Sequence, residues 1–234
     1  MRTQFVKTQN VMNLIGALGE LERRSPVVPG LFLMHGHQGY GKTMAGQWYA
    51  VQSGAVYVRA QAAWTVNWML QELCGRLNLP PEGITRNNFR QVREELYKRP
   101  RLVFMDEADY LIRDRRMLDT VRDLYDMSGA AIVLVGMAGS REAIARKSPQ
   151  FWSRVSQEVE FTPLTPADVQ VIAAELTDLK VEAAHAAQIR RQTEGNFRQT
   201  VVLLAQMETI VKSNPNPEMN KVVDLAAQKL RAVG

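Results

Sequence analysis

One segment constrains this chain more than any other: residues Gly36 to Thr43 read Gly-His-Gln-Gly-Tyr-Gly-Lys-Thr. They match the pattern Gly-x-x-x-x-Gly-Lys-[Ser/Thr], in which the backbone N–H groups of a glycine-rich loop surround phosphate groups. The apolar run 31–34 predicts the strand that must precede such a loop, and residues 44–51 predict the helix that follows it. The alternative, a glycine-rich turn without a ligand, does not account for this flanking pattern. The sequence therefore indicates a loop that binds ATP or GTP.

Each position in this loop has an expected role toward a bound nucleotide. Lys42 is expected to reach the β- and γ-phosphates and to take part in catalysis, while the Thr43 hydroxyl is expected to bind Mg²⁺. The expected cofactor-binding residues of the loop are Gly36, Gly39, Tyr40, Gly41, Lys42, Thr43 and Met44. A GTPase would also need an Asn-Lys-x-Asp guanine reader, and the segment 220–224 (Asn-Lys-Val-Val-Asp) is one residue too long. ATP and Mg²⁺ are therefore the expected cofactors.

Two adjacent carboxylates, Asp106 and Glu107, follow the apolar run 102–105. In an open α/β sheet this position lies at the carboxyl edge, where such sheets bind their ligands. Asp106 is expected to bind Mg²⁺ through water, and Glu107 to orient and polarise the water that attacks the γ-phosphate. The alternative is a strand end with two solvated acids. The pair favours ATP hydrolysis over phosphoryl transfer to a small molecule.

Short apolar runs alternate with helical patterns between residues 28 and 162. The runs are 31–34, 55–58, 102–105 and 131–135, with 159–161 as a fifth, and a helical pattern at 11–23 precedes them. They predict a parallel five-stranded α/β sheet flanked by helices. After Pro163 the strands stop, and helices are predicted at 166–177, 181–193, 197–212 and, after a break at 214–217, at 217–231. We expect an α/β nucleotide-binding core over 1–162 and a small all-α lid over 163–234.

Composition narrows the class of protein further. An apolar fraction of 46% and a charged fraction of 23% are typical of a soluble globular chain. The single cysteine, Cys74, excludes an internal disulfide and suits a reducing cytoplasm. No stretch approaches the roughly 20 apolar residues that span a bilayer, and the first residues lack the apolar core of a signal peptide. We expect a cytoplasmic protein without a membrane partner.

With these motifs identified, the chain resembles the AAA+ ATPases over nearly its whole length. Residues 151–155 (Phe-Trp-Ser-Arg-Val) and the following 159–164 resemble the arginine-finger region and the entry to the lid. The resemblance implies that Arg154 is a catalytic finger that reaches the γ-phosphate held by a neighbouring subunit. The segment 194–198 (Glu-Gly-Asn-Phe-Arg) resembles the sensor-2 motif, which implies that Arg198 contacts the nucleotide of its own subunit. The alternative for both is an ordinary surface arginine.

One position departs from the family's pattern. The fourth strand usually ends in a polar sensor-1 residue, but residues 135–140 read Val-Gly-Met-Ala-Gly-Ser. Met137 cannot hydrogen-bond strongly, and Ser140 stands further along the chain. Hydrolysis is therefore expected to be slow, or to need a partner that completes the site.

Within the AAA+ proteins, the chain is similar to the compact initiator and transposition group, which includes the Mu B transposition protein and the ATPases of related transposons. The features that carry this resemblance are Tyr57-Val-Arg59 followed by an amphipathic helix, the short lid, and the Gly-Asn-Phe-Arg segment. They imply a bacterial or phage-encoded homo-oligomer, ring or helical filament, that assembles on double-stranded DNA and delivers a target to a transposase. Two alternatives stay open: a helicase loader or replication initiator, and a nucleotide-switched assembly ATPase with no DNA role.

The net charge of +5 permits nucleic-acid binding without deciding it. One basic cluster precedes the Asp-Glu strand and another follows it. The candidate DNA contacts are Arg86, Arg90, Arg93, Lys98 and Arg99, then Arg113, Arg115 and Arg116. Arg90 and Arg93 share a helix face and are suited to follow a phosphate backbone without reading bases. The alternative is a solvated face on which Glu94, Glu95 and Asp114 pair with these arginines.

Overall fold

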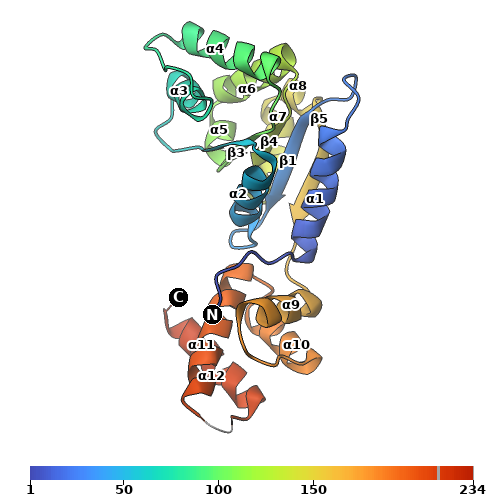
Figure 1. Ribbon diagram of the computed structural model, residues 1–234, viewed down its shortest axis with the longest axis vertical. Helices are drawn as coiled ribbons and strands as arrows, with labels where there is room; N and C mark the ends of the chain where they lie inside the picture. Colours follow the sequence, from blue (N-terminus) through green and yellow to red (C-terminus); the bar gives the residue numbers. More distant parts are fainter. Residues whose placement is uncertain (215–216, 234) are drawn as a thin grey trace. The chain divides into compact units, whose positions relative to one another are not determined.

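The structure, a computed structural model, describes residues 1–214 and 217–233 (Figure 1). Pro215 and Asn216, in the predicted break before the last helix, and Gly234, at the end of the predicted lid, lie outside the described residues. The chain forms two compact units. The sheet unit comprises Asn13–His37 and Lys42–Glu160, and the helical unit comprises Met1–Met12, Gln38–Gly41 and Phe161–Gly234.

Five strands form one parallel sheet in the order β2-β3-β4-β1-β5 (Figure 1). They are β1 (Leu31–Gly36), β2 (Val56–Arg59), β3 (Val103–Asp106), β4 (Ile132–Val135) and β5 (Val155–Phe161). The predicted five-stranded α/β sheet is thus confirmed. The first four strands begin and end within two residues of their predicted bounds. The edge strand β5 begins four residues earlier than predicted, because its mostly half-exposed residues include polar ones and give no continuous apolar run.

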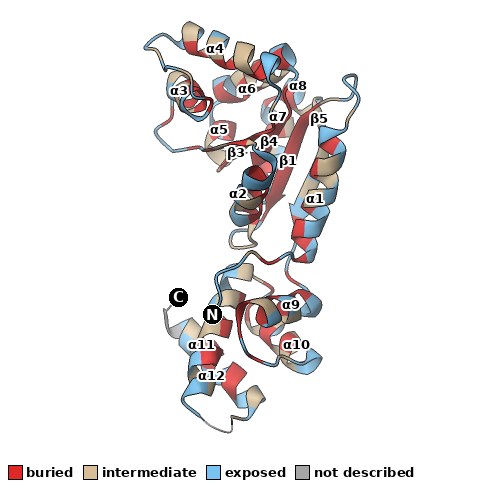
Figure 2. Cartoon of the chain, viewed as in Figure 1, coloured by how far each residue is buried: buried red, intermediate tan, exposed pale blue. Residues whose placement is uncertain are grey.

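Strands β1, β3 and β4 are buried along their whole length, which is why they read as uninterrupted apolar runs (Figure 2). Eight helices belong wholly or mainly to this part of the chain. They are α1 (Gln9–Glu22), α2 (Lys42–Ser53), α3 (Val66–Arg76), α4 (Thr85–Lys98), α5 (Asp109–Arg113), α6 (Arg115–Ser128), α7 (Ser140–Lys147) and α8 (Pro149–Trp152). One apolar core joins the strands to α3, α4 and α6 through side chains such as Leu73, Val92 and Leu124.

The helical unit contains α9 (Pro166–Leu176), α10 (Ala183–Gln192), α11 (Phe197–Lys212) and α12 (Met219–Val233) around its own apolar core. The predicted start of α9 is confirmed: Thr165 caps the helix, and the Thr165 and Asp168 side chains each accept the other residue's backbone N–H. Helix α12 begins at Met219 rather than at Pro217. Val6 is buried in the core of this unit, and the backbone N–H of Gln9 donates to Asp168 (2.7 Å). No helix in the described ranges is long and apolar enough to cross a membrane.

Candidate nucleotide-binding site

The glycine-rich loop connects the end of β1 to the first residue of α2, so its chain leads directly into a helix N-terminus (Figure 1). Gly39 and Gly41 have φ angles of +82° and +92°, in the left-handed region that side chains disfavour. At Gly39 a Cβ atom would also lie 2.6 Å from the amide group of Asn196. The four N–H groups that begin a helix have no partner within it and favour an anion. The loop therefore has the backbone of an anion-binding site.

Lys42 is buried, and its ammonium group points back at the loop. Its Nζ donates to the carbonyl oxygens of Gly36 (2.7 Å) and His37 (2.8 Å). Burial lowers the pKa of Lys42, while the negative charges of Asp109, Asp106 and Glu107 act in the opposite direction. The ammonium group is thus a cation in a region that already contains three carboxylates.

Asp106, the last residue of β3, is almost fully buried with an exposed fraction of 2%. One carboxylate oxygen accepts from the Glu107 backbone N–H (2.8 Å), and the other accepts from the Tyr57 hydroxyl (2.7 Å). Burial and this hydrogen bond raise the pKa of Tyr57, which stays protonated and keeps donating. The carboxylate is therefore fixed in orientation. Among the other predicted cofactor residues, Thr43 and Tyr40 are half-buried, and Met44 is exposed.

Glu107 has a φ angle of +55°, which is uncommon for a residue with a side chain. Its carboxylate accepts a hydrogen bond from the guanidinium of Arg59 (2.8 Å). Arg59 ends β2 and stands in register with Asp106 on β3, so the strand pairing itself brings it beside Glu107. The predicted water-activating carboxylate is therefore held by a cation from the neighbouring strand.

A third carboxylate, Asp109, connects this edge of the sheet to the turn after β4. Its Oδ2 accepts from the Met137 backbone N–H (2.9 Å), and its Oδ1 accepts from the Ser140 hydroxyl (3.0 Å). Ser140 stands further along the chain than a sensor-1 residue is expected to. Its hydroxyl nevertheless reaches Asp109 at the carboxyl edge of the sheet.

Three residues of this region had no predicted role in the site: Tyr57 and Arg59, which entered only as part of the family resemblance, and Asp109. The available signal for Asp109 was a third acid within four positions of the strand end. The available signal for Tyr57 and Arg59 was that two polar residues stand at alternate positions at the end of one strand.

Arg198 and Asn196 belong to the helical unit together with the loop residues Gln38–Gly41. Asn196 caps α11 by accepting the Gln199 backbone N–H, and its amide donates to the Gln38 carbonyl (3.0 Å). The backbone N–H of Arg198 donates to the Gly39 carbonyl (3.0 Å), while its side chain is exposed. Within the helical unit, the segment that resembles sensor-2 therefore contacts Gln38 and Gly39 directly.

Arg154 lies at the opposite edge of the sheet from the loop. Its carbonyl accepts from the N–H of Leu31, the first residue of β1, whereas the loop follows the last residue of that strand. The six residues of β1 span about 17 Å. The guanidinium donates to Asp126 (2.6 Å) and to the Gln150 carbonyl (2.7 Å). The structure therefore does not bring Arg154 to the phosphate loop of its own chain.

The two basic clusters differ in how their charges are paired. On α4, Arg86 and Arg90 are exposed and make no ion pair within residues 1–214 and 217–231. Arg93 pairs with Glu94 (3.2 Å) and Arg99 with Glu95 (3.8 Å), while Lys98 is exposed.

In the second cluster, Arg113 lies over the Tyr110 ring (5.1 Å), and Arg115 pairs with Asp119 (3.5 Å). Asp114 caps α6 by accepting the backbone N–H of Arg116, whose side chain is exposed. The expected pairing with Glu94 and Glu95 thus occurs, whereas Asp114 caps a helix instead of neutralising an arginine side chain.

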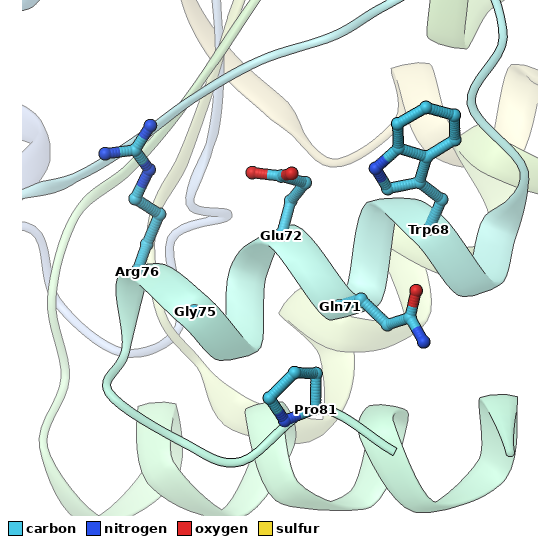
Figure 3. A pocket seen from close by; sticks show the side chains of 6 residues that line it. All are labelled: Trp68, Gln71, Glu72, Gly75, Arg76 and Pro81. Carbon is cyan, nitrogen blue, oxygen red and sulfur yellow. The ribbon is translucent and has the colours of Figure 1, made fainter. Parts of the chain in front are cut away.

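A surface pocket of about 510 Å³ lies on α3, and none of the predicted nucleotide-site residues lines it. Figure 3 shows the side chains of Trp68, Glu72 and Arg76 projecting from the same side of α3, one turn apart. The full lining is Trp68, Gln71, Glu72, Gly75, Arg76 and Pro81. This pocket is separate from the edge of the sheet that carries Asp106.

Comparison with known protein families matches residues 28–144 to the AAA domain. This range is half of the chain and contains the glycine-rich loop, Asp106 and Glu107. The chain belongs to the AAA domain family. A relative from Staphylococcus aureus, described as a potential ATP-binding protein, is 29% identical over 146 residues. That match covers 58% of this chain and 53% of the relative, so this AAA protein spans about half the relative's length.

Solved structures share the fold of this AAA protein. The Aeropyrum pernix ORC2 protein, in ADPNP-ADP complexes, superposes with a TM-score of 0.72 at 16% identity, over 96% of this chain and 68% of that one. The Aeropyrum pernix ORC1 protein in complex with DNA gives a TM-score of 0.64 at 18% identity, over 98% and 66%. At these identities the similarity shows the fold alone, and it confirms the predicted P-loop AAA+ fold.

Proposed function

We propose that this AAA protein is a Mg²⁺-dependent ATPase that assembles on DNA. The observation that carries the ATPase proposal is one local arrangement in the sheet unit. The buried Lys42 at the start of α2 donates to the Gly36 and His37 carbonyls at the end of β1, and Asp106 and Glu107 end or follow β3 at the same carboxyl edge of the sheet. A cation at a helix N-terminus suits the phosphates of a nucleoside triphosphate, and carboxylates at the carboxyl edge of the sheet suit its metal ion.

The donor set fits ATP with Mg²⁺. Lys42 donates to two carbonyls of its own loop, and phosphate oxygens, as stronger acceptors, would take these hydrogen bonds. Mg²⁺ in such sites is held by one or two protein oxygens plus substrate phosphates, so Thr43 and the fixed Asp106 suffice. When bound, Mg²⁺ would neutralise charge on the phosphate oxygens. No group of three or more acidic, His or Cys side chains in the described residues forms a metal cage, and an ATP-bound Mg²⁺ needs none.

In this proposal Glu107 accepts a proton from the attacking water or orients it. The carboxylate must first leave Arg59, to which it is hydrogen-bonded at 2.8 Å. Met137 has no polar side chain, and its backbone N–H already donates to Asp109. At this position the turn after β4 therefore offers no hydrogen bond to a nucleotide. Slow turnover in the absence of a partner follows from both features.

A neighbouring copy would supply the missing positive charge. Arg154 lies about a strand length away from its own loop, so any role in catalysis requires the loop of another subunit. Arg198, next to the contact between Asn196 and Gln38, would act on the nucleotide of its own chain. The helical lid over 163–234 would thereby couple nucleotide state to assembly of a homo-oligomer, as a ring or a helical filament.

The surface we propose for DNA is one face of α4. At about 100° per residue, Arg86, Arg90, Arg93 and Tyr97 fall within about 60° of the helix circumference. Arg86 and Arg90 are free of ion pairs among the described residues, and Tyr97 is 71% exposed. Such a face suits the phosphate backbone, without base readout. Lys98 and Arg99 would extend this surface; Arg113, Arg115 and Arg116 form the second candidate.

Delivery of a DNA target to a transposase is the biological role we propose, on the resemblance of the loop, lid and Gly-Asn-Phe-Arg segment to that group. A second candidate, a replication initiator or helicase loader, is favoured by the fold shared with ORC1, which was solved in complex with DNA. An assembly ATPase without a DNA role is the third reading. Stimulation of DNA strand transfer by a transposase supports the first role, and stimulated loading of a replicative helicase supports the second.

Phosphate release from ATP tests the ATPase proposal. Lys42→Ala is expected to weaken ATP binding by about 100-fold or more, because phosphates would lose a charged donor. Glu107→Gln is expected to bind ATP normally and to lower turnover by about 10²- to 10⁴-fold. Lys229→Ala, an exposed lysine on α12, is the matched control. Turnover in Lys42→Ala equal to the wild type would show that the measured activity does not come from this loop.

Co-sedimentation with duplex DNA tests the assembly proposal. The protein is expected to pellet with DNA in the presence of a non-hydrolysable ATP analogue and much less with ADP. The double variant Arg86→Ala/Arg90→Ala should weaken binding and reduce the slope of log K against log[salt] by about 2. Arg115→Ala/Arg116→Ala is the matched control from the second cluster. Loss of binding in that control alone would move the DNA surface to α5 and α6, and absence of DNA binding at low salt would leave the assembly ATPase.

A further inference from the structure

Asp109 uses both oxygens of its carboxylate to hold the turn between β4 and α7. The Met137 backbone N–H lies 2.9 Å from Oδ2, and the Ser140 hydroxyl lies 3.0 Å from Oδ1. Helix α7 begins at Ser140 after Gly139, and no side chain caps it by bonding to its backbone. The turn is therefore held from outside by Asp109, the first residue of α5, beside Met137, which has no polar side chain.

The same turn is also bonded to the glycine-rich loop. The Ala138 backbone N–H donates to the Gly36 carbonyl at 3.0 Å. That carbonyl is one of the two that accept the Lys42 ammonium group, at 2.7 Å. Asp109 is thus connected to Lys42 by three hydrogen bonds, at Met137, Ala138 and Gly36, together with the peptide bond that joins Met137 to Ala138.

On its other side Asp109 is joined to the residue that is proposed to activate water. It follows Glu107 by two positions, and the Ala108 N–H donates to the Val135 carbonyl at the end of β4 (2.9 Å). At the far end of α5, Lys147 of α7 donates to the Ile112 carbonyl (3.0 Å). Helix α5 is therefore hydrogen-bonded to β4 through the residue before its first turn and to α7 near its end.

We propose that Asp109 is a positioning residue of the nucleotide site, which couples the turn 137–140 to Lys42 on one side and to Glu107 on the other. This inference rests on the proposed ATPase function. Met137 has no side chain that could bond to the phosphates. Asp109 instead acts on the site indirectly, through its hydrogen bonds to the turn 137–140. The carboxylate offers two negatively charged acceptors, one for the Met137 backbone N–H and one for the Ser140 hydroxyl. An asparagine offers one neutral acceptor oxygen, and its NH₂ group would have to donate to the hydroxyl, so both charge-assisted bonds are lost.

The alternative is that Asp109 only stabilises the fold. A purely structural residue would lower thermal stability and weaken ATP binding and turnover together when replaced. A positioning residue would lower turnover while ATP binding is kept. Removal of a negative charge close to Lys42 is even expected to favour phosphate binding, because like charges then repel the phosphates less. The two readings therefore predict opposite effects on ATP affinity.

The test compares three variants of the full chain. Asp109→Asn removes the charge and reverses the bond to Ser140, whose hydroxyl would have to accept from the new NH₂ group. Ser140→Ala removes only the hydroxyl bond and leaves the carboxylate, so it decides the question if Asp109→Asn fails to fold. Asp114→Asn is the matched control: Asp114 lies five residues further on and also accepts a backbone N–H, from Arg116 at 2.9 Å, but it caps α6 outside this network. The measurements are melting temperature, equilibrium affinity for ATP, and phosphate release at saturating ATP.

We expect Asp109→Asn to lower turnover by about tenfold or more, with ATP bound as tightly as by the wild type or several-fold more tightly. Ser140→Ala should change turnover in the same direction by up to about tenfold, in keeping with the loss of one hydrogen bond to a charged group. Asp114→Asn should leave both unchanged. The proposal is overturned if Asp109→Asn and Ser140→Ala turn over like the wild type, or if their ATP affinity falls in parallel with turnover.

A second readout does not depend on turnover and separates this proposal from the proposed ATPase activity. Amide hydrogen exchange is followed in the peptide covering 136–140, with and without a non-hydrolysable ATP analogue. The analogue should slow exchange of this peptide in the wild type and in Asp114→Asn, but not in Asp109→Asn, at equal occupancy of the site. If the wild type binds the analogue yet releases no phosphate, the ATPase proposal fails while the exchange experiment still tests Asp109. Wild-type protection in Asp109→Asn would overturn its role.

Discussion

The guanidinium of Arg59 donates a 2.8 Å hydrogen bond to the carboxylate of Glu107. The two side chains come from neighbouring strand ends, β2 and β3, and both are partly exposed, with side-chain exposed fractions of 60% and 35%. An ion pair with this exposure contributes little to stability, about 0–1 kcal/mol. Its consequence is orientation: the carboxylate proposed to activate water is directed toward a cation at the edge of its own sheet.

Replacement of Arg59 by Ala is expected to raise turnover by about two- to fivefold, which corresponds to the free energy of breaking a half-exposed ion pair. The physical reason is that Glu107 no longer has to leave a partner before it contacts water. ATP affinity and melting temperature should stay close to the wild type. Arg99→Ala removes a comparable pair with Glu95 on α4 and is the control. If Arg59→Ala instead loses turnover to the level of Glu107→Gln, Arg59 is needed to position the carboxylate during hydrolysis.

The parts of the site that the sequence predicts are those whose signals are local in the chain. The glycine-rich loop, Lys42 and the Asp106–Glu107 pair are each read from a short motif next to a buried strand, and the long apolar runs place the strands themselves. The side chains that hold Asp106 and Glu107 follow from the register of β2 against β3, which are separated by more than 40 residues. No local pattern encodes that register.

Two further features depend on backbone geometry and exposure. Glu107 has a positive φ angle, and nothing in the sequence around it predicts this conformation. Strand β5 was only partly predicted, because an edge strand mixes polar and apolar residues. The link from Asp109 to Met137 joins residues 28 positions apart. It becomes visible only when β3 and β4 are placed side by side.

Tyr57→Phe removes the hydroxyl that donates to the buried Asp106 carboxylate (2.7 Å). We expect a loss of about 1–2 kcal/mol in the free energy of unfolding, because a buried acceptor is left without its donor. We also expect the Mg²⁺ concentration for half-maximal turnover to rise by about tenfold, since partners of a metal-binding carboxylate keep it oriented. Tyr49→Phe is the control: its hydroxyl donates to Glu22 (2.8 Å), outside the site. Equal Mg²⁺ requirements in both variants would contradict the role of Asp106 in binding the metal.

Arg154→Ala is expected to lose most ATP turnover at concentrations where oligomers form, with ATP affinity unchanged. The decisive measurement mixes this variant, which keeps an intact loop, with Lys42→Ala, which keeps Arg154. Each variant alone should be nearly inactive, and the mixture should recover activity, because some interfaces then combine a working loop with a working arginine. Asp126→Asn, which removes the negative charge that pairs with Arg154 at 2.6 Å, should leave the mixture active. A mixture that stays inactive while oligomers form would rule out an arginine shared between subunits.

Two substitutions at Asn196 separate its two hydrogen bonds, both of which lie within the helical unit. Its side-chain oxygen accepts the Gln199 N–H at the start of α11, and its amide donates to the Gln38 carbonyl (3.0 Å). Asn196→Ala removes both and should cost about 1 kcal/mol in unfolding free energy. Asn196→Asp keeps the cap, and its charge suits a helix N-terminus, so stability should be retained. Because both variants release the loop, ATP affinity should fall by about three- to tenfold in each, the free energy of one neutral hydrogen bond. Wild-type affinity in Asn196→Asp, measured by isothermal titration, would show that this contact does not order the loop for the nucleotide.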